Sequence, residues 1–505
     1  MPALPLRILI VGAGFAGLGA AIALKRAGFH DLTVLDRGDE VGGTWRDNVY
    51  PGCACDIPSH LYSFSFDTDF DWERPYAGQP QILAYLKHLA DRHGLRPHLR
   101  LRTEVRRATW VEARRVWQLQ LGDGETLEGD VLVAGTGGLV NPALPRIEGL
   151  ADFPGPVFHS ARWRQDVDLA GKRIALIGTG ASAVQIAPEL AREAGRLHIF
   201  QRTAPWVLPR GDRPYGRLRR WLYRWVPGLR RANRWRLYAV HELVTAALLG
   251  HAPLLRLIAW TARRHLRRQL GHDPALLARA APQGQPGCKR LLLSDTWYPT
   301  LARPNVALVT EGIARIVPEG VVTTDGQLHP ADAIVLSTGF SLGGGLSRTQ
   351  GRLEAPLGAL WLRDGAKAHL GLAVHGFPNM ITLLGPGTGL GSNSIVFMLE
   401  AQLGYLVQAV RHLAREGGVL DLRAQVQADG HADLQRRLQG TVWLSGCKSW
   451  YQGRDGRIDS LWPDFSFNYW RRTRRFDPGV YASSLQPGGA APQPVVATPS
   501  RSTAP

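Results

Sequence analysis

Cysteine is scarce in this sequence. The 505 residues include four cysteines, at positions 53, 55, 288 and 447. Four residues so widely spaced do not form the disulfide framework that holds small secreted domains together, so we expect a protein of the reducing cytoplasm. The first apolar run begins at Ile8, which leaves no room for a signal peptide before it.

Long uninterrupted apolar segments are also missing. The most apolar long window, residues 238–260, contains His241, Glu242, His251, Pro253 and Arg256. These residues argue against a membrane span. A pair of buried helices is the structure expected there.

Acidic residues are fewer than basic ones. Lysine and arginine total 60 against 42 aspartates and glutamates, which gives a formal net charge of +18. Such an excess is typical of proteins that bind nucleic acid or an anionic membrane surface. The arginines are nevertheless spread along the chain, with one cluster between Arg210 and Arg268. We therefore favour an arginine-rich protein that binds polyanionic cofactors, expect no nucleic acid, and keep contact with a membrane surface as the alternative.

What the chain does contain, at its start, is a dinucleotide-binding pattern. An apolar run leads into a turn with Gly12, Gly14 and Gly17, and a helix is expected to follow. Gly12 permits the tight turn, Gly14 lets the backbone approach a pyrophosphate, and Gly17 lets the helix pack on the strand. The next apolar run ends on Asp36, at the distance where a βαβ unit places an acid on the ribose diol.

A second copy of this pattern begins at residue 172. Its turn contains Gly178, Gly180 and Ser182, and the following strand ends on Gln201-Arg202-Thr203 in place of an acid. Arg202 can form a bidentate pair with a 2′-phosphate, which an acid would repel. The first lobe is therefore expected to bind a dinucleotide without this phosphate and the second to prefer NADPH. The alternative is that Arg202 is a solvated cation at the end of a strand.

Two similar segments, residues 116–137 and 321–339, each read as a hairpin followed by the last strand of a lobe. The second lobe would then lie inside the first in sequence. We predict an α/β fold of two nested Rossmann-like domains. The predicted parts are 1–148 and 335–478 for a discontinuous first domain, 149–334 for the second, 213–285 for a helical cap inserted in it, and 479–505 for a disordered tail.

Three motifs resemble one enzyme family. Phe153, Gly155, His159 and Trp163 fit the fingerprint F-x-G-x-x-x-H-x-x-x-W; Gly42-Gly43-Thr44-Trp45 precedes Asp56 at the family spacing; and Gly287-Cys288-Lys289-Arg290 follows the helical cap. With these motifs the chain resembles the class B flavin-dependent monooxygenases, and within them the Baeyer–Villiger monooxygenases, from Arg7 to about Tyr469. Arg164 departs from the family, which commonly has Pro or Asp at this position.

The resemblance implies FAD in the first domain, NADPH in the second, and roles for individual residues. Arg290 would be the cation that enters the active site beside the flavin, and Asp56 the carboxylate that pairs with it. His159 would belong to the linker between the domains. Further contacts would come from two sets: Gly43, Thr44, Trp45 and Asn393 for FAD, and Lys289, Arg202, Thr203 and the mobile-loop residue Trp450 for NADPH.

By the same resemblance the protein would use NADPH and O2 to turn a ketone into an ester or lactone, through a peroxide at flavin C4a. The guanidinium of Arg290 would keep this peroxide deprotonated and stabilise the oxyanion of the adduct, while Asp56 holds the guanidinium in place. No metal is predicted, and a monomer or a homodimer is expected.

Three alternatives stay open. The first is a flavin N- or S-oxygenase on the same scaffold. The second is a non-catalytic protein that senses dinucleotides or binds polyanions, which only the net charge supports. The third is a disulfide reductase, but the single residue between Cys53 and Cys55 differs from the spacing of flavin disulfide reductases.

Overall fold

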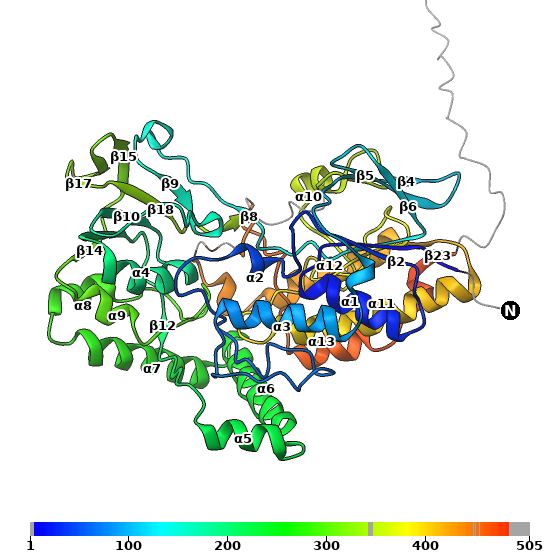
Figure 1. Ribbon diagram of the computed structural model, residues 1–505, viewed down its shortest axis with the longest axis horizontal. Coiled ribbons are helices and arrows are strands. Elements are labelled where there is room, and N and C mark those ends of the chain that lie inside the picture. Colours follow the sequence, from blue (N-terminus) through cyan, green and yellow to red (C-terminus); the bar gives the residue numbers. More distant parts are fainter. Residues whose placement is uncertain (1–4, 342–346, 448, 450, 454, 484–505) are drawn as a thin grey trace, which may run out of the picture.

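The structure, a computed structural model, describes residues 5–341, 347–447, 449, 451–453 and 455–483. Figure 1 shows two lobes side by side, the first on the right and the second, in green, on the left, with a group of helices below them. The chain begins in the first lobe, builds the second, and then returns to the first. The predicted α/β fold with two Rossmann-like lobes is confirmed.

The first lobe is built on a parallel sheet in the order β21-β7-β1-β2-β3. Its central strands β1 (Ile8–Val11), β2 (Leu32–Leu35) and β7 (Val131–Ala134) are short, almost completely buried apolar runs, as parallel strands covered on both faces require. The edges are β3 (Leu99–Arg100) and β21 (Met380–Thr382). Since β21 follows the whole second lobe in sequence, this sheet combines two distant parts of the chain.

The second lobe has its own parallel sheet in the order β14-β11-β10-β18-β9. The strands are β9 (Val157–His159), β10 (Arg173–Ile177), β11 (Arg196–Phe200), β14 (Val306–Val309) and β18 (Ala333–Leu336). The predicted domain boundary between residues 334 and 335 is wrong, because it falls inside β18. Because β18 pairs with both β10 and β9, the chain leaves the second lobe only after it.

Both predicted hairpins are present as antiparallel strands. In the first lobe they are β4 (Val105–Val111), β5 (Val116–Leu121) and β6 (Thr126–Gly129), and β20 (Thr349–Gln350) adds to β4. In the second lobe they are β15 (Ile313–Val317), β16 (Gly320–Thr323) and β17 (Leu328–Pro330). Each group leads directly into a strand of the parallel sheet, β7 in the first lobe and β18 in the second, and the chain then crosses to the other lobe.

Helices cover the sheets. On the first lobe they are α1 (Phe15–Arg26), α2 (Thr44–Asp47), α3 (Gln79–Arg92), α10 (Leu357–Asp364), α11 (Ile395–Glu416), α12 (Ala424–Leu438) and α13 (Ser466–Thr473). On the second lobe α4 (Ala181–Glu193) follows β10, and α9 (Trp297–Leu301) follows the short parallel pair β12 (Val207–Leu208) and β13 (Leu292–Leu293).

The helical cap consists of α5 (Arg217–Trp225), α6 (Leu229–Leu248), α7 (Ala252–Leu270) and α8 (Pro274–Ala280). The prediction that its most apolar window forms two buried helices is wrong. α6 and α7 bury one face each, whereas Leu243 is 59% and Trp260 is 58% exposed. Within the described residues no single helix is long and apolar enough to cross a membrane. Taken as a pair, α6 and α7 have the length and composition of a span, but their axes are bent by 105° at the break between them.

The two crossings between the lobes run together as a ribbon. β8 (Asn141–Pro142) on the way out pairs antiparallel with β19 (Phe340–Ser341) on the way back. The hydroxyl of Thr338 also donates to the carbonyl of Ala143, at 2.6 Å. A paired crossing of this kind restricts the lobes to fewer relative orientations than two separate linkers would allow.

The predicted tail begins too early. Residues 481–483 form β23 (Tyr481–Ser483), which pairs antiparallel with β22 (Leu420–Leu422) because Tyr481 packs into the first-lobe core and its hydroxyl lies 2.9 Å from that of Tyr405. Residues 479 and 480 belong to a short 3-10 helix, Pro478–Val480, and the predicted tail from residue 484 on lies outside the described residues.

A disulfide joins Cys288 to Cys447, with 6.2 Å between the Cα atoms. The sequence analysis expected no disulfide framework and did not predict this single bond. The two residues are 159 positions apart, so their proximity arises only when the end of the helical cap packs on the segment after α12, and sequence spacing cannot reveal it. Cys53 and Cys55 are free.

Loss of this disulfide should destabilise the junction between the helical cap and the first lobe. Because the bond closes a long loop, we expect Cys447→Ser to lower the free energy of unfolding by about 2–4 kcal/mol, and a reductant to reproduce this in the wild type. Urea denaturation followed by circular dichroism measures both, with Cys53→Ser as the control. Equal urea midpoints for all three proteins, with and without reductant, would rule the disulfide out.

Candidate active site at the junction of the two lobes

The glycine turn after β1 is forced by close backbone contacts. Gly12 has φ +105°, and a Cβ there would lie 2.4 Å from the carbonyl oxygen of Gly135. A Cβ on Gly17 would lie 1.7 Å from the carbonyl oxygen of Gly12, so α1 can pack this closely only with glycine. Gly14 precedes α1 without a side-chain cap, and its Cα faces Gly43. The bare N-terminus of α1 and the two glycine backbones fit a pyrophosphate.

Asp36 stands at the end of β2 as predicted, but its oxygens already have partners. Oδ2 accepts from the backbone N–H of Ala13 at 2.8 Å, and Oδ1 accepts from that of Gly38 at 2.8 Å and from Nη1 of Arg46 at 2.7 Å. The carboxylate therefore ties the glycine turn to α2. Arg46, which the sequence analysis missed, directly follows the predicted residues Thr44 and Trp45, so its position next to the motif was the available signal.

Of the remaining predicted FAD residues, Thr44 and Trp45 lie beside this turn, whereas Asn393 lies against the helical cap. Thr44 and Trp45 form the start of α2, where Nε1 of Trp45 donates to the hydroxyl of Tyr62 at 3.1 Å. Asn393 is buried, and its Nδ2 donates to Glu242 on α6 at 2.9 Å. Its amide is thus engaged within the protein, and it joins the segment before α11 to the helical cap.

The second glycine turn leaves open space at the N-terminus of α4. Gly178 has φ +114° at the end of β10, and Gly180 precedes α4 with no side-chain cap. A Cβ on Gly180 would meet nothing within 4 Å, and Ser182 lies in the first helical turn. The backbone N–H groups at this helix start can therefore receive a phosphate.

Two predicted phosphate ligands, Arg202 and Lys289, come close together although they are far apart in sequence. Burial and then the charge of Arg202 lower the pKa of Lys289. Neither cation has an acidic partner within 4.0 Å in the part of the chain that is described, and Arg202 and its neighbour Thr203 are exposed. Two uncompensated cations beside the open turn fit the 2′-phosphate of NADPH.

Asp56 and Arg290 form a bidentate ion pair. Nε of Arg290 donates to Oδ2 of Asp56 at 2.6 Å and Nη2 donates to Oδ1 at 2.8 Å, while both side chains stay about one-quarter exposed. Burial alone would raise the pKa of Asp56, but the charge and hydrogen bonds of Arg290 lower it. Asp56 raises the pKa of Arg290 in turn, so both groups stay charged. A fixed cation with an exposed edge can stabilise negative charge on a reactant.

Tyr451 is a further neighbour of this pair that the sequence analysis missed. The residue is buried, which raises the pKa of its hydroxyl, and Arg290 partly opposes this rise. The predicted contact residue Trp450 lies outside the described residues. Tyr451, the next residue in sequence, shows where this segment approaches the ion pair.

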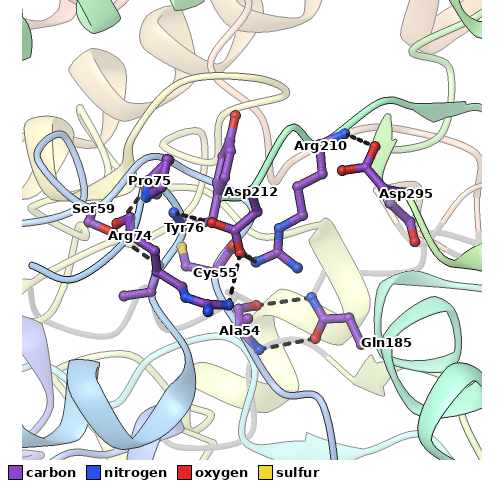
Figure 2. A network of polar contacts seen from close by, with 12 residues as sticks. Ala54, Cys55, Ser59, Arg74, Pro75, Tyr76, Gln185, Arg210, Asp212 and Asp295 are labelled. Atoms are coloured by element: carbon purple, nitrogen blue, oxygen red, sulfur yellow. Dashed lines mark hydrogen bonds and ion pairs between the residues drawn. The ribbon is translucent and has the colours of Figure 1, made fainter. Parts of the chain in front are cut away.

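The segment that carries Asp56 is held by side chains of the second lobe (Figure 2). Gln185 on α4 donates to the carbonyl of Ala54 at 3.0 Å and accepts from the N–H of the same residue at 3.3 Å. Arg210 donates to the carbonyl of Cys55 at 3.1 Å. No motif marked either residue, because each contributes through a contact between distant segments.

Arg210 is itself fixed by two acids of the second lobe, and one of them, Asp212, also binds residues of the first lobe. Its Nη2 lies 3.8 Å from Asp212, which also accepts from the N–H of Tyr76 at 3.2 Å and pairs with Arg74 at 3.4 Å. Its backbone N–H donates to Asp295 at 3.0 Å. The network drawn in Figure 2 therefore fixes the position of Asp56 relative to the second lobe.

The fingerprint residues lie in and around β9, the edge strand of the second sheet. His159 ends β9, is buried, and its Nδ1 accepts from the N–H of Ala161 at 3.1 Å. Its ring lies 5.8 Å from that of Phe340 in β19, and burial lowers its pKa. Phe153 and Trp163 pack into the same lobe, and Gly155 lies against the carbonyl of Asp332. These positions suit a role in joining the lobes.

Known proteins are similar to this chain in sequence and in architecture. Residues 9–242 match the pyridine nucleotide-disulphide oxidoreductase family. The chain is 45% identical over 480 residues to a Baeyer-Villiger monooxygenase of Streptomyces coelicolor, covering 94% of this chain and 92% of the relative. It is 40% identical over 486 residues to a Baeyer-Villiger monooxygenase of Pseudomonas aeruginosa, covering 95% and 92%. The structure of OTEMO in complex with FAD and NADP has a TM-score of 0.82 at 26% identity, covering 93% of this chain and 97% of that one. Together with the motifs, these matches identify the chain as a member of the Baeyer–Villiger monooxygenase family.

Proposed function

We propose that this enzyme uses NADPH and O2 to insert an oxygen atom beside the carbonyl of a ketone, giving an ester or a lactone. The bidentate pair of Asp56 and Arg290 at the junction of two dinucleotide-binding lobes carries this proposal. The names of the relatives support the reaction, and the FAD and NADP of the OTEMO complex support the cofactors. The substrate is a small molecule, as for other members of this family.

FAD would be held by the first lobe, with its pyrophosphate at the glycine backbones of residues 12, 14 and 43, and NADPH by the second, with its 2′-phosphate on Arg202, Thr203 and Lys289. Bound FAD supplies the hydride acceptor and the position at which O2 is activated. The open helix starts and the two uncompensated cations described above fit these groups.

Arg290 would stabilise the negative charge that develops during the reaction. Addition of a nucleophile to the ketone carbon leaves negative charge on the ketone oxygen, and a nearby guanidinium stabilises that charge. The same cation favours an anionic oxygen nucleophile over its protonated form, and the anion is the form that attacks a carbonyl. Asp56 would keep the guanidinium oriented, since it stays ionised and binds two of its N–H groups.

The test is a product analysis. The purified protein is reduced with NADPH without oxygen, then mixed with oxygenated buffer and a panel of ketones, amines and sulfides. We expect a ketone to be converted into an ester or lactone. Oxygenation of amines or sulfides alone would transfer the protein to the N- or S-oxygenases, and no flavin reduction would leave only the non-catalytic alternative.

Arg290→Ala should separate oxygen insertion from NADPH oxidation. Removal of one group that stabilises developing charge lowers the rate about 100-fold, so we expect little ester while NADPH is still consumed and hydrogen peroxide is released. FAD content should not change. Arg164→Ala, which breaks an exposed ion pair with Asp166, is the matched control. Full ester formation by Arg290→Ala would contradict the assignment.

Binding of NADPH should weaken at high pH through Lys289. Because the pKa of this residue is lowered, it loses its proton at a lower pH than an ordinary lysine, and the uncharged form binds a phosphate less well. We expect the KM for NADPH to rise there in the wild type and to be about tenfold higher, without that rise, in Lys289→Gln. NADH, which lacks the 2′-phosphate, is the control. The same pH profile for NADPH in both proteins would contradict a role for Lys289.

The location in the cytoplasm and the oligomeric state, a monomer or a homodimer, stay predictions. Gel filtration with light scattering tests the second of these directly.

A further inference from the structure

Most of the net charge of the protein belongs to the helical cap. Residues 213–271 contain fourteen arginines and one acidic residue, Glu242, so this segment carries +13 of the total of +18. Glu242 is buried, and it accepts hydrogen bonds from Asn393 and Ser466. In the described part of the chain, acids lie within 4.0 Å only of Arg220 and Arg234 among these arginines. The positive charge of the cap is therefore largely uncompensated.

The same helices expose large apolar side chains. On α5, Leu218, Trp221 and Trp225 are 70%, 55% and 62% exposed, and their spacing of three and four residues puts them on one face. On α6, Trp235 is 64% exposed. Four of the five tryptophans that are exposed in the described residues lie in this cap, at positions 221, 225, 235 and 260.

Arginine and apolar residues share faces. On α7, Leu257 and Trp260 lie on the same side of the helix as three exposed arginines, because these residues follow one another at helical spacing. The arginines are Arg264, Arg267 and Arg268. A solvated face would not place tryptophan and leucine between the charges. This combination is typical of helices that lie at a membrane interface, with tryptophan at the level of the head groups.

The cap helices occupy one edge of the molecule. In Figure 1, α5, α6 and α7 lie together below both lobes. The hydroxyl of Tyr238 on α6 lies 3.0 Å from that of Ser466, which begins α13, and the next residues of α13 include Phe467 and Trp470, 41% and 45% exposed. α13, which contacts the cap through Ser466, thus also exposes large apolar side chains.

A concavity at the turn between α5 and α6 adds a place for an anionic group. It has a volume of about 330 Å³, and its lining includes Arg224, Arg230 and Arg231 together with Thr68 and Asp69. Asp69 already pairs with Arg92 at 2.9 Å. Arg230 donates to the carbonyls of Tyr223 and Thr68, both at 2.7 Å, whereas Arg224 and Arg231 are exposed and have no acid within 4.0 Å among the described residues. Exposed arginines beside an open concavity suit a phosphate.

We propose that the surface formed by α5, α6 and α7 docks the enzyme on an anionic lipid bilayer. Arginines would pair with lipid phosphates while tryptophan and leucine enter the interface. A second copy of the chain fits less well, because it would bring +13 against +13. Nucleic acid would satisfy the arginines but not the exposed leucines. The sequence analysis kept membrane contact only as an alternative, because the arginines are spread along the chain and polyanionic cofactors could account for the charge.

Vesicle binding of the full-length, FAD-loaded protein tests this proposal. We expect it to sediment with vesicles that contain phosphatidylglycerol, and much less with vesicles of phosphatidylcholine alone, with binding that weakens as salt rises. Trp221→Ser combined with Trp225→Ser should reduce binding, and so should Arg267→Gln combined with Arg268→Gln, by about fivefold for each charge removed. Leu362→Ser and Arg415→Gln, exposed positions outside the cap, are the matched controls.

Several outcomes would contradict docking on a lipid bilayer. One is the absence of sedimentation with phosphatidylglycerol vesicles at low salt while circular dichroism shows the native fold. A second is equal loss of binding in the control variants. Tighter binding to duplex DNA than to vesicles, unchanged by the tryptophan substitutions, would favour nucleic acid, and a dimer that those substitutions dissociate would favour a second copy. Ester formation from a water-soluble ketone is measured in parallel and should not change, so failure here is distinct from failure of the proposed reaction.

Discussion

The ion pair between Asp56 and Arg290 is the interaction on which the arrangement of the site depends. Its two residues are 234 positions apart and come from the two lobes of the molecule. Partly buried charges lose hydration, and this cost is offset only when geometry and further hydrogen bonds are good. The bidentate contact and the added charge of Arg210 meet this requirement and keep both groups ionised. The pair therefore exists only while the lobes keep this relative position.

One helix links the pair to the predicted NADPH site. α4 begins at the open turn after Gly178, and five residues after Gly180 it carries Gln185, which holds the backbone of Ala54 next to the Asp56 segment. The ribbon of β8 and β19, with the ring of His159 against it, constrains the lobes from the other side. Gln185 thus joins the helix that follows the dinucleotide turn to the segment that carries Asp56.

The sequence predicted those features that depend on local chemistry. Glycine turns, apolar strands and the two closing hairpins follow from neighbouring residues, and the resemblance supplied Asp56 and Arg290. Gln185, Tyr451 and the pairing of Cys288 with Cys447 could not be predicted, since each depends on the approach of segments that are far apart. The exposure of α6 and α7 was missed for a related reason: an apolar composition does not say whether a second surface covers it.

The most direct test of this account measures ester formed per NADPH consumed in Asp56→Asn and in the wild type, with one ketone that the wild type accepts. The substitution keeps the size of the side chain and removes its charge. If Asp56 orients Arg290, FAD stays bound and NADPH is still oxidised in the variant, while the ester yield falls and hydrogen peroxide is released in place of the ester. An unchanged yield would show that the pair does not orient Arg290 for the reaction.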